Sequence, residues 1–223
     1  MKIPILKSWA SYIREIPVES IRSTFNNQLE LVIKNGEYQL CTEHAVYSYG
    51  QRYTNFKYCF EKMNLSHISE VLILGLGLGS IIHILEKNYP NTFAFTCIEI
   101  DESVIYLASK YTTSDITSYV DIIQADATAF VQYTEEKYDL ICVDLFIDDL
   151  IPDIAQSRDF LQNCAECLTP NGILVSNHLG FNKTDKQAAT NYYNTVFKDV
   201  FPNSEMLSIS KNLLMVSEKS FLK

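Results

Sequence analysis

Short apolar runs alternate with amphipathic segments along most of the chain, from about Glu70 onward. Such runs are typical of strands that are buried on both faces of a parallel sheet. The last two runs are separated only by Lys211, which is too short for a parallel crossover, so they form an antiparallel hairpin. The predicted strands are Val71–Leu74, Phe93–Ile100, Tyr119–Ala125, Tyr138–Leu145, Ile173–Asn177, Glu205–Ser210 and Asn212–Ser217.

In the segments between these strands, apolar residues recur with the spacing of an α-helix. Asp101 is placed to cap a helix whose apolar residues follow the i, i+3, i+4, i+7 series, and Pro90 ends an earlier helix. Alternating strands and helices predict an α/β fold with a doubly wound, mostly parallel seven-stranded sheet that is Rossmann-like, and such sheets bind ligands at the carboxyl ends of their strands. The predicted helices are Ser80–Tyr89, the helix after Asp101, Ser157–Leu168 and Lys183–Val200.

The first 67 residues have a different pattern. Leu29–Lys34 and Glu37–Cys41 flank Asn35-Gly36, which is a strong signal for a two-residue hairpin turn. A helix is expected over Ser8–Ile16. We therefore predict a small N-terminal cap with a β-hairpin at residues 1–67 and a Rossmann-like domain at residues 68–223; the family resemblance described below implies that this second domain is the adenosyl-binding catalytic domain.

The composition and charge of the chain restrict the classes of molecule that it can bind. The 223 residues are 47% hydrophobic, and residues 63–157 contain 3 Lys and Arg against 15 Asp and Glu. So acidic a segment repels nucleic acid and attracts small cations. The longest apolar stretch, Val71 to Leu85, is interrupted by three glycines, and no secretory signal is recognisable. We expect a cytoplasmic protein that acts on a small, cationic substrate and has no nucleic-acid or membrane partner. The sequence leaves the oligomeric state open, with a homodimer as one alternative.

Cysteine and histidine spacing predicts neither disulfides nor a metal site. The six cysteines lie mostly in apolar surroundings, as free thiols do in a reducing compartment. Cys164-x-x-Cys167 has no second CxxC or His pair, and its spacing fits a buried helix face. We expect no metal.

A glycine turn follows the first of these strands. Three of the seven glycines of the chain, Gly75, Gly77 and Gly79, lie between that strand and the next helix. Glycines here permit a tight turn and a close backbone approach to a ligand. Glu99 ends the following strand, where an acid accepts hydrogen bonds from ribose hydroxyls. The pair predicts a nucleoside site.

Two more acids end the next strands. Asp126, followed by Ala127, ends the third predicted strand, and Asp144 lies at the end of the fourth. Because parallel strands end at one edge of a sheet, these carboxylates should meet Glu99 there. No Lys or Arg occurs from Tyr138 to Ser157, so the loop after Asp144 is acidic and suits an amine or a sulfonium.

Together these motifs resemble the spermidine-synthase-like branch of the class I S-adenosylmethionine-dependent methyltransferase superfamily, over roughly residues 29 to 180. The glycine turn is similar to that branch's first motif, and the Tyr138–Asp144 strand to the strand that ends in its catalytic aspartate. Ile98–Asp101 resembles the ribose motif and Gln124–Ala127 the adenine motif. Asn35-Gly36-x-x-Gln39 and Tyr47 look like its N-terminal hairpin and the tyrosine near the substrate amine.

The resemblance implies roles for particular residues. Asp144 would orient or deprotonate an acceptor, with Tyr47 as a weaker second catalytic residue. The cofactor would be S-adenosylmethionine or its decarboxylated form. The residues implied in binding it are Gln39, Gly75, Gly77, Gly79, Glu99, Ile100, Asp126, Ala127 and Asp144.

The chain also departs from the branch. Aminopropyltransferases carry an aspartate, which holds the amine of decarboxylated S-adenosylmethionine, where this chain has Leu78. An Asp-Ser-Ser-Asp-Pro type segment is replaced by Asp144-Leu-Phe-Ile-Asp148-Asp149, and the N-terminal β-domain is cut to one hairpin. We therefore expect methyl transfer from intact S-adenosylmethionine to a small polar or amine substrate. The alternatives are a polyamine aminopropyltransferase (spermidine synthase) and a non-catalytic adenosyl-binding protein. A nicotinamide dehydrogenase ranks lower because Ser80 stands where the dinucleotide fingerprint needs Gly or Ala.

Overall fold

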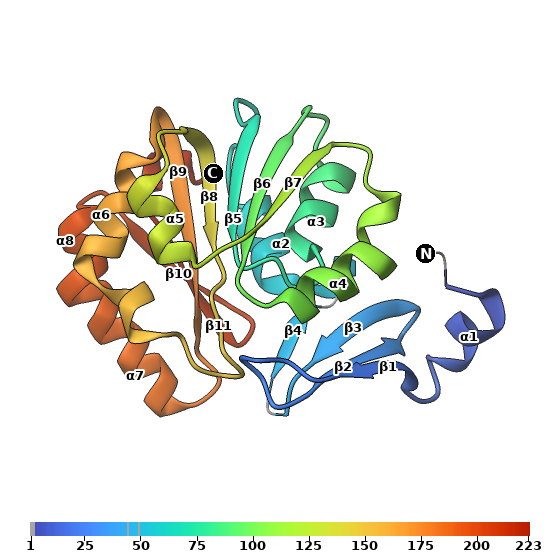
Figure 1. The fold of residues 1–223 in the computed structure, drawn as a ribbon. Helices are drawn as coiled ribbons and strands as arrows, with labels where there is room; N and C mark the ends of the chain where they lie inside the picture. Colours follow the sequence, from blue (N-terminus) through green and yellow to red (C-terminus); the bar gives the residue numbers. More distant parts are fainter. Residues whose placement is uncertain (1–2, 44, 49) are drawn as a thin grey trace.

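A computed structural model describes residues 3–43, 45–48 and 50–223, and it contains one large and one small sheet (Figure 1). The large sheet has seven strands in the order β10-β11-β9-β8-β5-β6-β7. Its five strands from β9 to β7 are parallel, while β10 and β11 form an antiparallel hairpin beside β9. The predicted fold class is confirmed. The strands are β5 (Glu70–Leu74), β6 (Ala94–Glu99), β7 (Tyr119–Gln124), β8 (Tyr138–Val143), β9 (Leu168–Leu179), β10 (Glu205–Ile209) and β11 (Asn212–Val216).

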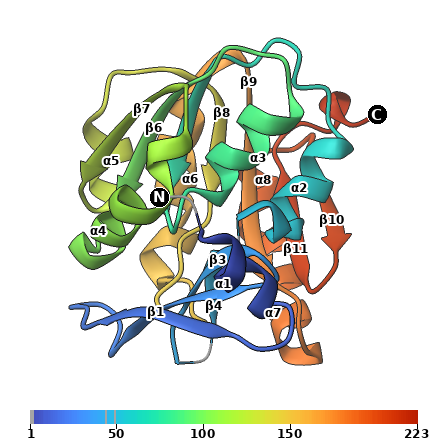
Figure 2. The ribbon, with the colours of Figure 1, turned by 90° about the vertical axis from the view of Figure 1, so that its right-hand side faces the viewer.

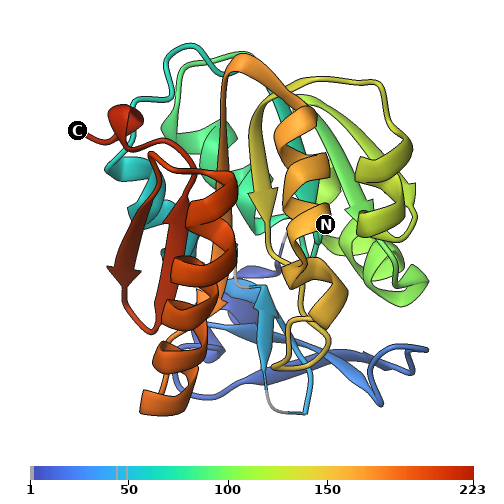
Figure 3. The same ribbon diagram turned by 90° about the vertical axis from the view of Figure 1, so that its left-hand side faces the viewer.

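Helices cover both faces of this sheet. Successive residues of β5 point to opposite faces, so Val71 and Ile73 join one buried cluster while Leu72 and Leu74 join the other. The first cluster packs against α2 (Thr54–Glu61), α3 (Ser80–Asn88) and α4 (Glu102–Tyr111). The second, seen from its own side in Figure 3, packs against α5 (Ala127–Tyr133), α6 (Arg158–Glu166), α7 (Lys183–Tyr192) and the π-helical Tyr193–Phe197, which α8 (Lys198–Val200) follows. Short 3-10 turns occupy Gly50–Arg52, Thr113–Asp115, Asp153–Gln156 and Lys219–Phe221.

Side-chain caps start several of these helices. Asp101 accepts a hydrogen bond from the Ser103 N–H and begins α4, as its position in the sequence predicts. Ser157 caps α6 in the same way. The helices α2 and α5 were not predicted, because they are short and the apolar period is weak in so few residues.

The small sheet is antiparallel and contains β1 (Ile16–Ile21), β2 (Leu29–Lys34), β3 (Glu37–Cys41) and β4 (Val46–Ser48). The β2–β3 hairpin turns at Asn35-Gly36 with positive φ angles of 49° and 79°, as predicted. The expectation of a single hairpin is wrong, because β1 and β4 extend it on both sides. The helix is also misplaced in the prediction, since α1 covers Ile5–Ala10 and lies beside the β2–β3 turn (Figure 2).

The predicted division at residue 67 stays a prediction, but α2, which precedes it, packs with the large sheet. Phe56 and Phe60 of α2 are fully buried in the same cluster as Val71 and Ile73. His44 and Tyr49 lie outside the described residues. No helix in the described parts of the chain is both long and apolar enough to cross a membrane.

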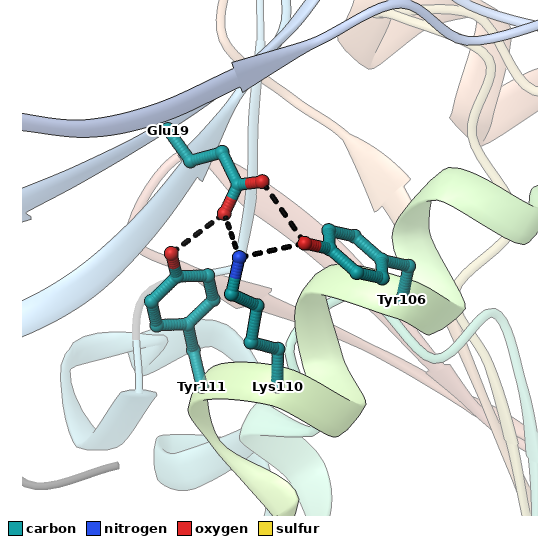
Figure 4. A network of polar contacts seen from close by, with 4 residues as sticks. All are labelled: Glu19, Tyr106, Lys110 and Tyr111. Carbon is teal, nitrogen blue, oxygen red and sulfur yellow. Dashed lines mark hydrogen bonds and ion pairs between the residues drawn. The ribbon is translucent and has the colours of Figure 1, made fainter.

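The small sheet is fixed to α4 by an apolar core and a polar network. Leu29, Leu31 and Leu40 pack against Val104 and Leu107 of α4. Figure 4 shows the polar network. It includes an ion pair of 2.9 Å between Lys110 Nζ and Glu19 Oε2. The Glu19 carboxylate of β1 binds three side chains of α4, namely Tyr106, Lys110 and Tyr111. These contacts hold the small sheet over the end of the large sheet where β5, β6 and β8 finish (Figure 1).

Candidate active site

A cavity of about 1040 Å³ lies at the carboxyl ends of the parallel strands. The chain proceeds from β5 to β6 and β7 on one side, then returns to place β8 on the other side of β5. This topological switch point leaves a crevice between β5 and β8, where doubly wound sheets bind their ligands. Gly75 follows β5 and Asp144 follows β8, and both line the cavity.

Nearly all of the predicted site residues meet in this cavity. The exception is Gly79, which precedes α3 with a φ of 76° and whose added side chain would face Ile82. Its contribution is therefore to the start of the helix. The predicted residues that line the cavity are Gln39, Tyr47, Gly75, Gly77, Glu99, Ile100, Asp126, Ala127 and Asp144.

Two glycines of the turn are required because other parts of the chain approach them closely. A β-carbon on Gly75, whose φ is 95°, would lie 2.3 Å from the carbonyl oxygen of Asp144. A β-carbon on Gly77, whose φ is 52°, would lie 3.1 Å from the Ser48 β-carbon in β4. The turn thus lets β5, β8 and the small sheet converge on one point.

Replacing Gly75 with alanine should therefore disturb the position of Asp144. We expect the Gly75→Ala change to lower the free energy of unfolding by roughly 2 to 4 kcal/mol, because it adds a backbone clash to a strained φ. Gly79→Ala is the matched control, since its β-carbon would meet only Ile82 Cδ1 at 3.5 Å. Urea unfolding of the two variants measures the difference, and equal losses would contradict the assigned clash.

Glu99 lies at the end of β6, where it lines the cavity and is held by backbone hydrogen bonds. Its Oε2 accepts a hydrogen bond from the Leu76 N–H at 3.1 Å and its Oε1 from the Asp101 N–H at 3.0 Å. Burial raises the pKa of this carboxyl, while the backbone N–H groups act to lower it. A carboxylate has about four acceptor sites, so Glu99, which lines the cavity, can also accept a hydrogen bond from a ligand hydroxyl.

Asp144 lies at the centre of a polar chain. Its Oδ2 accepts a 2.7 Å hydrogen bond from the Tyr53 hydroxyl, and its Oδ1 accepts a 2.8 Å bond from Asn177 Nδ2. Asn177 is oriented in turn by Asn212, which donates to its Oδ1 at 2.9 Å. Burial raises the pKa of Asp144 to about 6, against the opposing effect of the Asn177 and Tyr53 hydrogen bonds. A carboxylate with this pKa can act as a general base near neutral pH.

The tyrosine beside Asp144 is Tyr53 and not Tyr47. The Tyr47 hydroxyl lies 2.7 Å from Asn26 Oδ1 and accepts a hydrogen bond from the Asp148 N–H. Tyr47 therefore fixes the loop that follows β8, and its predicted catalytic role remains a prediction.

Three other predicted residues line the cavity from β3 and from the end of β7. Asp126 caps α5 by accepting a hydrogen bond from the Ala129 N–H, so its carboxylate is already engaged. Ala127 begins that helix. Gln39 is buried and its Nε2 contacts Cys41 Sγ at 2.9 Å.

Acidic groups outnumber basic ones around the cavity. Carboxylates lower the electrostatic potential in a partly enclosed space, which attracts cationic ligands. The acidic lining residues are Glu99, Asp101, Asp126, Asp144, Asp148, Asp149 and Asp185, against Lys34, Arg52 and Lys211.

Sequence reasoning missed the neutral polar residues of the site. Tyr53, Asn55, Asn177 and Asn212 all line the cavity. Asn177 ends a predicted strand at the same edge as Asp144, so the strand pattern of the sequence already places it near Asp144. Tyr53 directly precedes α2, a helix that the sequence pattern did not reveal.

The sequence profile of the spermine/spermidine synthase domain matches residues 51–217. The chain belongs to this family. It is 30% identical over 151 residues to a polyamine aminopropyltransferase of Vibrio vulnificus, covering 66% of this chain and 49% of that protein. It is 33% identical over 152 residues to one of Clostridioides difficile, covering 63% and 51%. The chain thus spans about half the length of these curated relatives.

Solved structures of the family have the same fold. A crystal structure of spermidine synthase in complex with the transition state analogue AdoDATO superposes with a TM-score of 0.71 at 17% identity, covering 90% of this chain and 72% of that one. A probable spermidine synthase from Corynebacterium glutamicum gives a TM-score of 0.70 at 16% identity, covering 91% and 79%. The human methyltransferase-like protein 13 with SAH gives 0.57 at 22% identity, covering 69% and 73%.

The expectation of methyl transfer is wrong. It is contradicted by the family match and by relatives that are named polyamine aminopropyltransferases. The inference depended on Leu78, whose side chain was expected to face the cofactor. Leu78 is instead buried against Leu31, Leu40 and Leu107, in the core between the small sheet and α4, and does not line the cavity.

Proposed function

We propose that this chain transfers an aminopropyl group from decarboxylated S-adenosylmethionine to a small aliphatic amine. The observation that carries the proposal is Asp144, a carboxylate held by Tyr53 and Asn177 at the switch point of the sheet, with a pKa raised to about 6. Membership of the spermine/spermidine synthase family and the acidic cavity support the same reaction class.

The adenosyl part of the donor is assigned to the β6 side of the cavity. Glu99 would accept hydrogen bonds from the two ribose hydroxyls, and Ile100 provides apolar contact beside it. Asp126 and Ala127 lie at the end of the next strand, where they would border the adenine. The sulfonium then lies toward β5 and β8, within the field of Asp144.

The transfer itself is a single displacement. The amine nitrogen forms a bond to the propyl carbon attached to sulfur, and that carbon–sulfur bond breaks, so the electron pair returns to sulfur. The products are an extended amine and the neutral thioether 5′-methylthioadenosine. Asp144 accepts the proton that the amine must lose, while the rigid cavity supplies position and orientation.

The pH dependence of the reaction follows from the protonation of Asp144. We expect kcat/KM to rise as pH increases through about 6, because only the ionised carboxylate accepts a proton. The Tyr53 hydroxyl stabilises that ionised form by donating to it. Tyr53→Phe should therefore move the rising limb to higher pH, and a limb that stays in place or moves to lower pH would contradict the assignment. Initial rates from pH 5 to about 9 provide the measurement.

The proposal is tested by the products. Purified protein is incubated with decarboxylated S-adenosylmethionine and 1,4-diaminobutane, and the mixture is analysed by mass spectrometry. The proposal predicts equal amounts of 5′-methylthioadenosine and of the diamine extended by one aminopropyl group. Tight binding of the donor without turnover, over a panel of amines, would contradict it and favour a non-catalytic adenosyl-binding protein.

A further inference from the structure

The cavity contains one buried polar atom that has no partner. Among the described residues, the side-chain oxygen of Asn55 is the buried side-chain atom left without a hydrogen bond. Asn55 is only 5% exposed, and the surface that it retains faces the candidate active site, since it lines that cavity. An unsatisfied buried carbonyl group is destabilising, so it requires an explanation.

Asn55 lies in the acceptor half of the cavity, next to the proposed base. It is in the first turn of α2, two residues after Tyr53, whose hydroxyl donates to Asp144. A hydrogen bond from the Asn55 side chain lowers the pKa of Tyr53, although burial raises that pKa more strongly. Asn55 therefore lies beside the Tyr53–Asp144 network, and its unpartnered oxygen is left for a ligand.

From this geometry we infer that Asn55 selects an amine over an alcohol as the acceptor, by accepting one of the N–H groups of the amine. The inference rests on the proposed function and adds a specificity-determining residue to it. A primary ammonium brings three N–H groups to the site. Asp144 takes one proton, the lone pair that this frees is aimed at the reacting carbon, and Asn55 Oδ1 holds one of the two remaining N–H groups.

The same arrangement rejects an alcohol. A hydroxyl has a single hydrogen, which must go to Asp144, so none remains for Asn55 Oδ1. The buried oxygen would then stay unsatisfied in the complex. A site built to bond a particular hydrogen discriminates strongly against an analogue that lacks it, for this reason. Asn55 thereby distinguishes amines from alcohols of the same length.

The test measures acceptor binding apart from catalysis. The protein is saturated with 5′-methylthioadenosine, which fills the donor site without reacting, and is titrated with 1,4-diaminobutane in a calorimeter. Asn55→Leu removes the oxygen at nearly constant volume, and Asn55→Ala removes it without a steric conflict. Asn88→Leu is the matched control, because Asn88 bonds the Ile84 carbonyl in α3 and lies outside the cavity.

We expect both Asn55 variants to bind the diamine about 10- to 100-fold more weakly, with unchanged affinity for 5′-methylthioadenosine and with KM raised more than kcat is lowered. Asn88→Leu should bind both ligands as the wild type does. Unchanged diamine affinity in a folded Asn55 variant would overturn the role of Asn55 and leave the proposed function intact. If the wild type with bound 5′-methylthioadenosine does not bind the diamine, the acceptor class is wrong and the proposed function fails with it.

Discussion

Asp144→Asn is expected to lower kcat for aminopropyl transfer by about 100- to 10,000-fold, the usual contribution of a general base. Asparagine retains the shape of the side chain, can still accept from Asn177 and can donate to the Tyr53 oxygen, but it cannot take a proton. The affinity for 5′-methylthioadenosine should remain unchanged, because the proposed mechanism places Asp144 beside the acceptor amine. Single-turnover rates and calorimetry separate the two effects.

The same substitution should stabilise the folded protein. The pKa of Asp144 is raised from 3.8 to about 6 in the native state. Above pH 6 the carboxylate is ionised in both states, but its charge is less favourable in the buried native site than in the unfolded chain. Removing the charge should increase the free energy of unfolding at pH 7.5 by up to about 3 kcal/mol, and the gain should vanish below about pH 4. Loss of turnover with lower stability at pH 7.5 would contradict this interpretation of Asp144.

Asp139→Asn is the control for both measurements. Asp139 lies at the other end of β8, where its carboxylate accepts hydrogen bonds from Ser69, Glu70 and Thr169 outside the cavity. These bonds together lower its pKa, although burial acts in the opposite direction. Its replacement should therefore destabilise the protein and leave turnover intact, which is the reverse of the result expected at Asp144.

Glu99→Ala is expected to weaken binding of 5′-methylthioadenosine by about 10- to 150-fold, which corresponds to the 1.5 to 3 kcal/mol of hydrogen bonds to a charged group. The variant loses the acceptor for both ribose hydroxyls. It also loses the partner of the Leu76 and Asp101 N–H groups, so its unfolding must be measured in parallel.

Glu86→Ala provides the comparison for that change. Glu86 also orders backbone, since its Oε1 accepts from the N–H groups of Thr117 and Ser118, but it lies outside the cavity. Both variants should lose stability, and only Glu99→Ala should lose affinity. Equal affinities for 5′-methylthioadenosine in the two proteins would remove Glu99 from the site.

The large sheet could be predicted because its strands are continuous apolar runs and its helices carry their own caps. Residues at strand ends were therefore placed correctly in relation to one another, and Glu99, Asp126 and Asp144 share one cavity as expected. The small sheet was predicted only where Asn35-Gly36 forces a turn. The flanking β1 and β4 are short edge strands with mixed polarity, and their pairing depends on tertiary contacts that local pattern does not encode.

The acceptor side of the site could not be derived from the sequence in the same way. Tyr53 reaches Asp144 across 91 positions of sequence, a separation at which local spacing carries no information. Leu78 shows the opposite error: its place within the glycine motif suggested contact with the cofactor, but the backbone turns its side chain into the apolar core beside α4. The position of Leu78 in the motif correctly indicated that the residue follows the end of β5. It wrongly indicated that the side chain points toward the cofactor.

The identity of the sulfur-containing product tests the central claim most directly. The protein is given equal concentrations of S-adenosylmethionine and its decarboxylated form, with 1,4-diaminobutane as acceptor, and the thioether products are separated by chromatography. Aminopropyl transfer predicts that 5′-methylthioadenosine accumulates in step with the extended amine, and that Asp144→Asn abolishes both. Accumulation of S-adenosylhomocysteine with a methylated diamine would contradict the account.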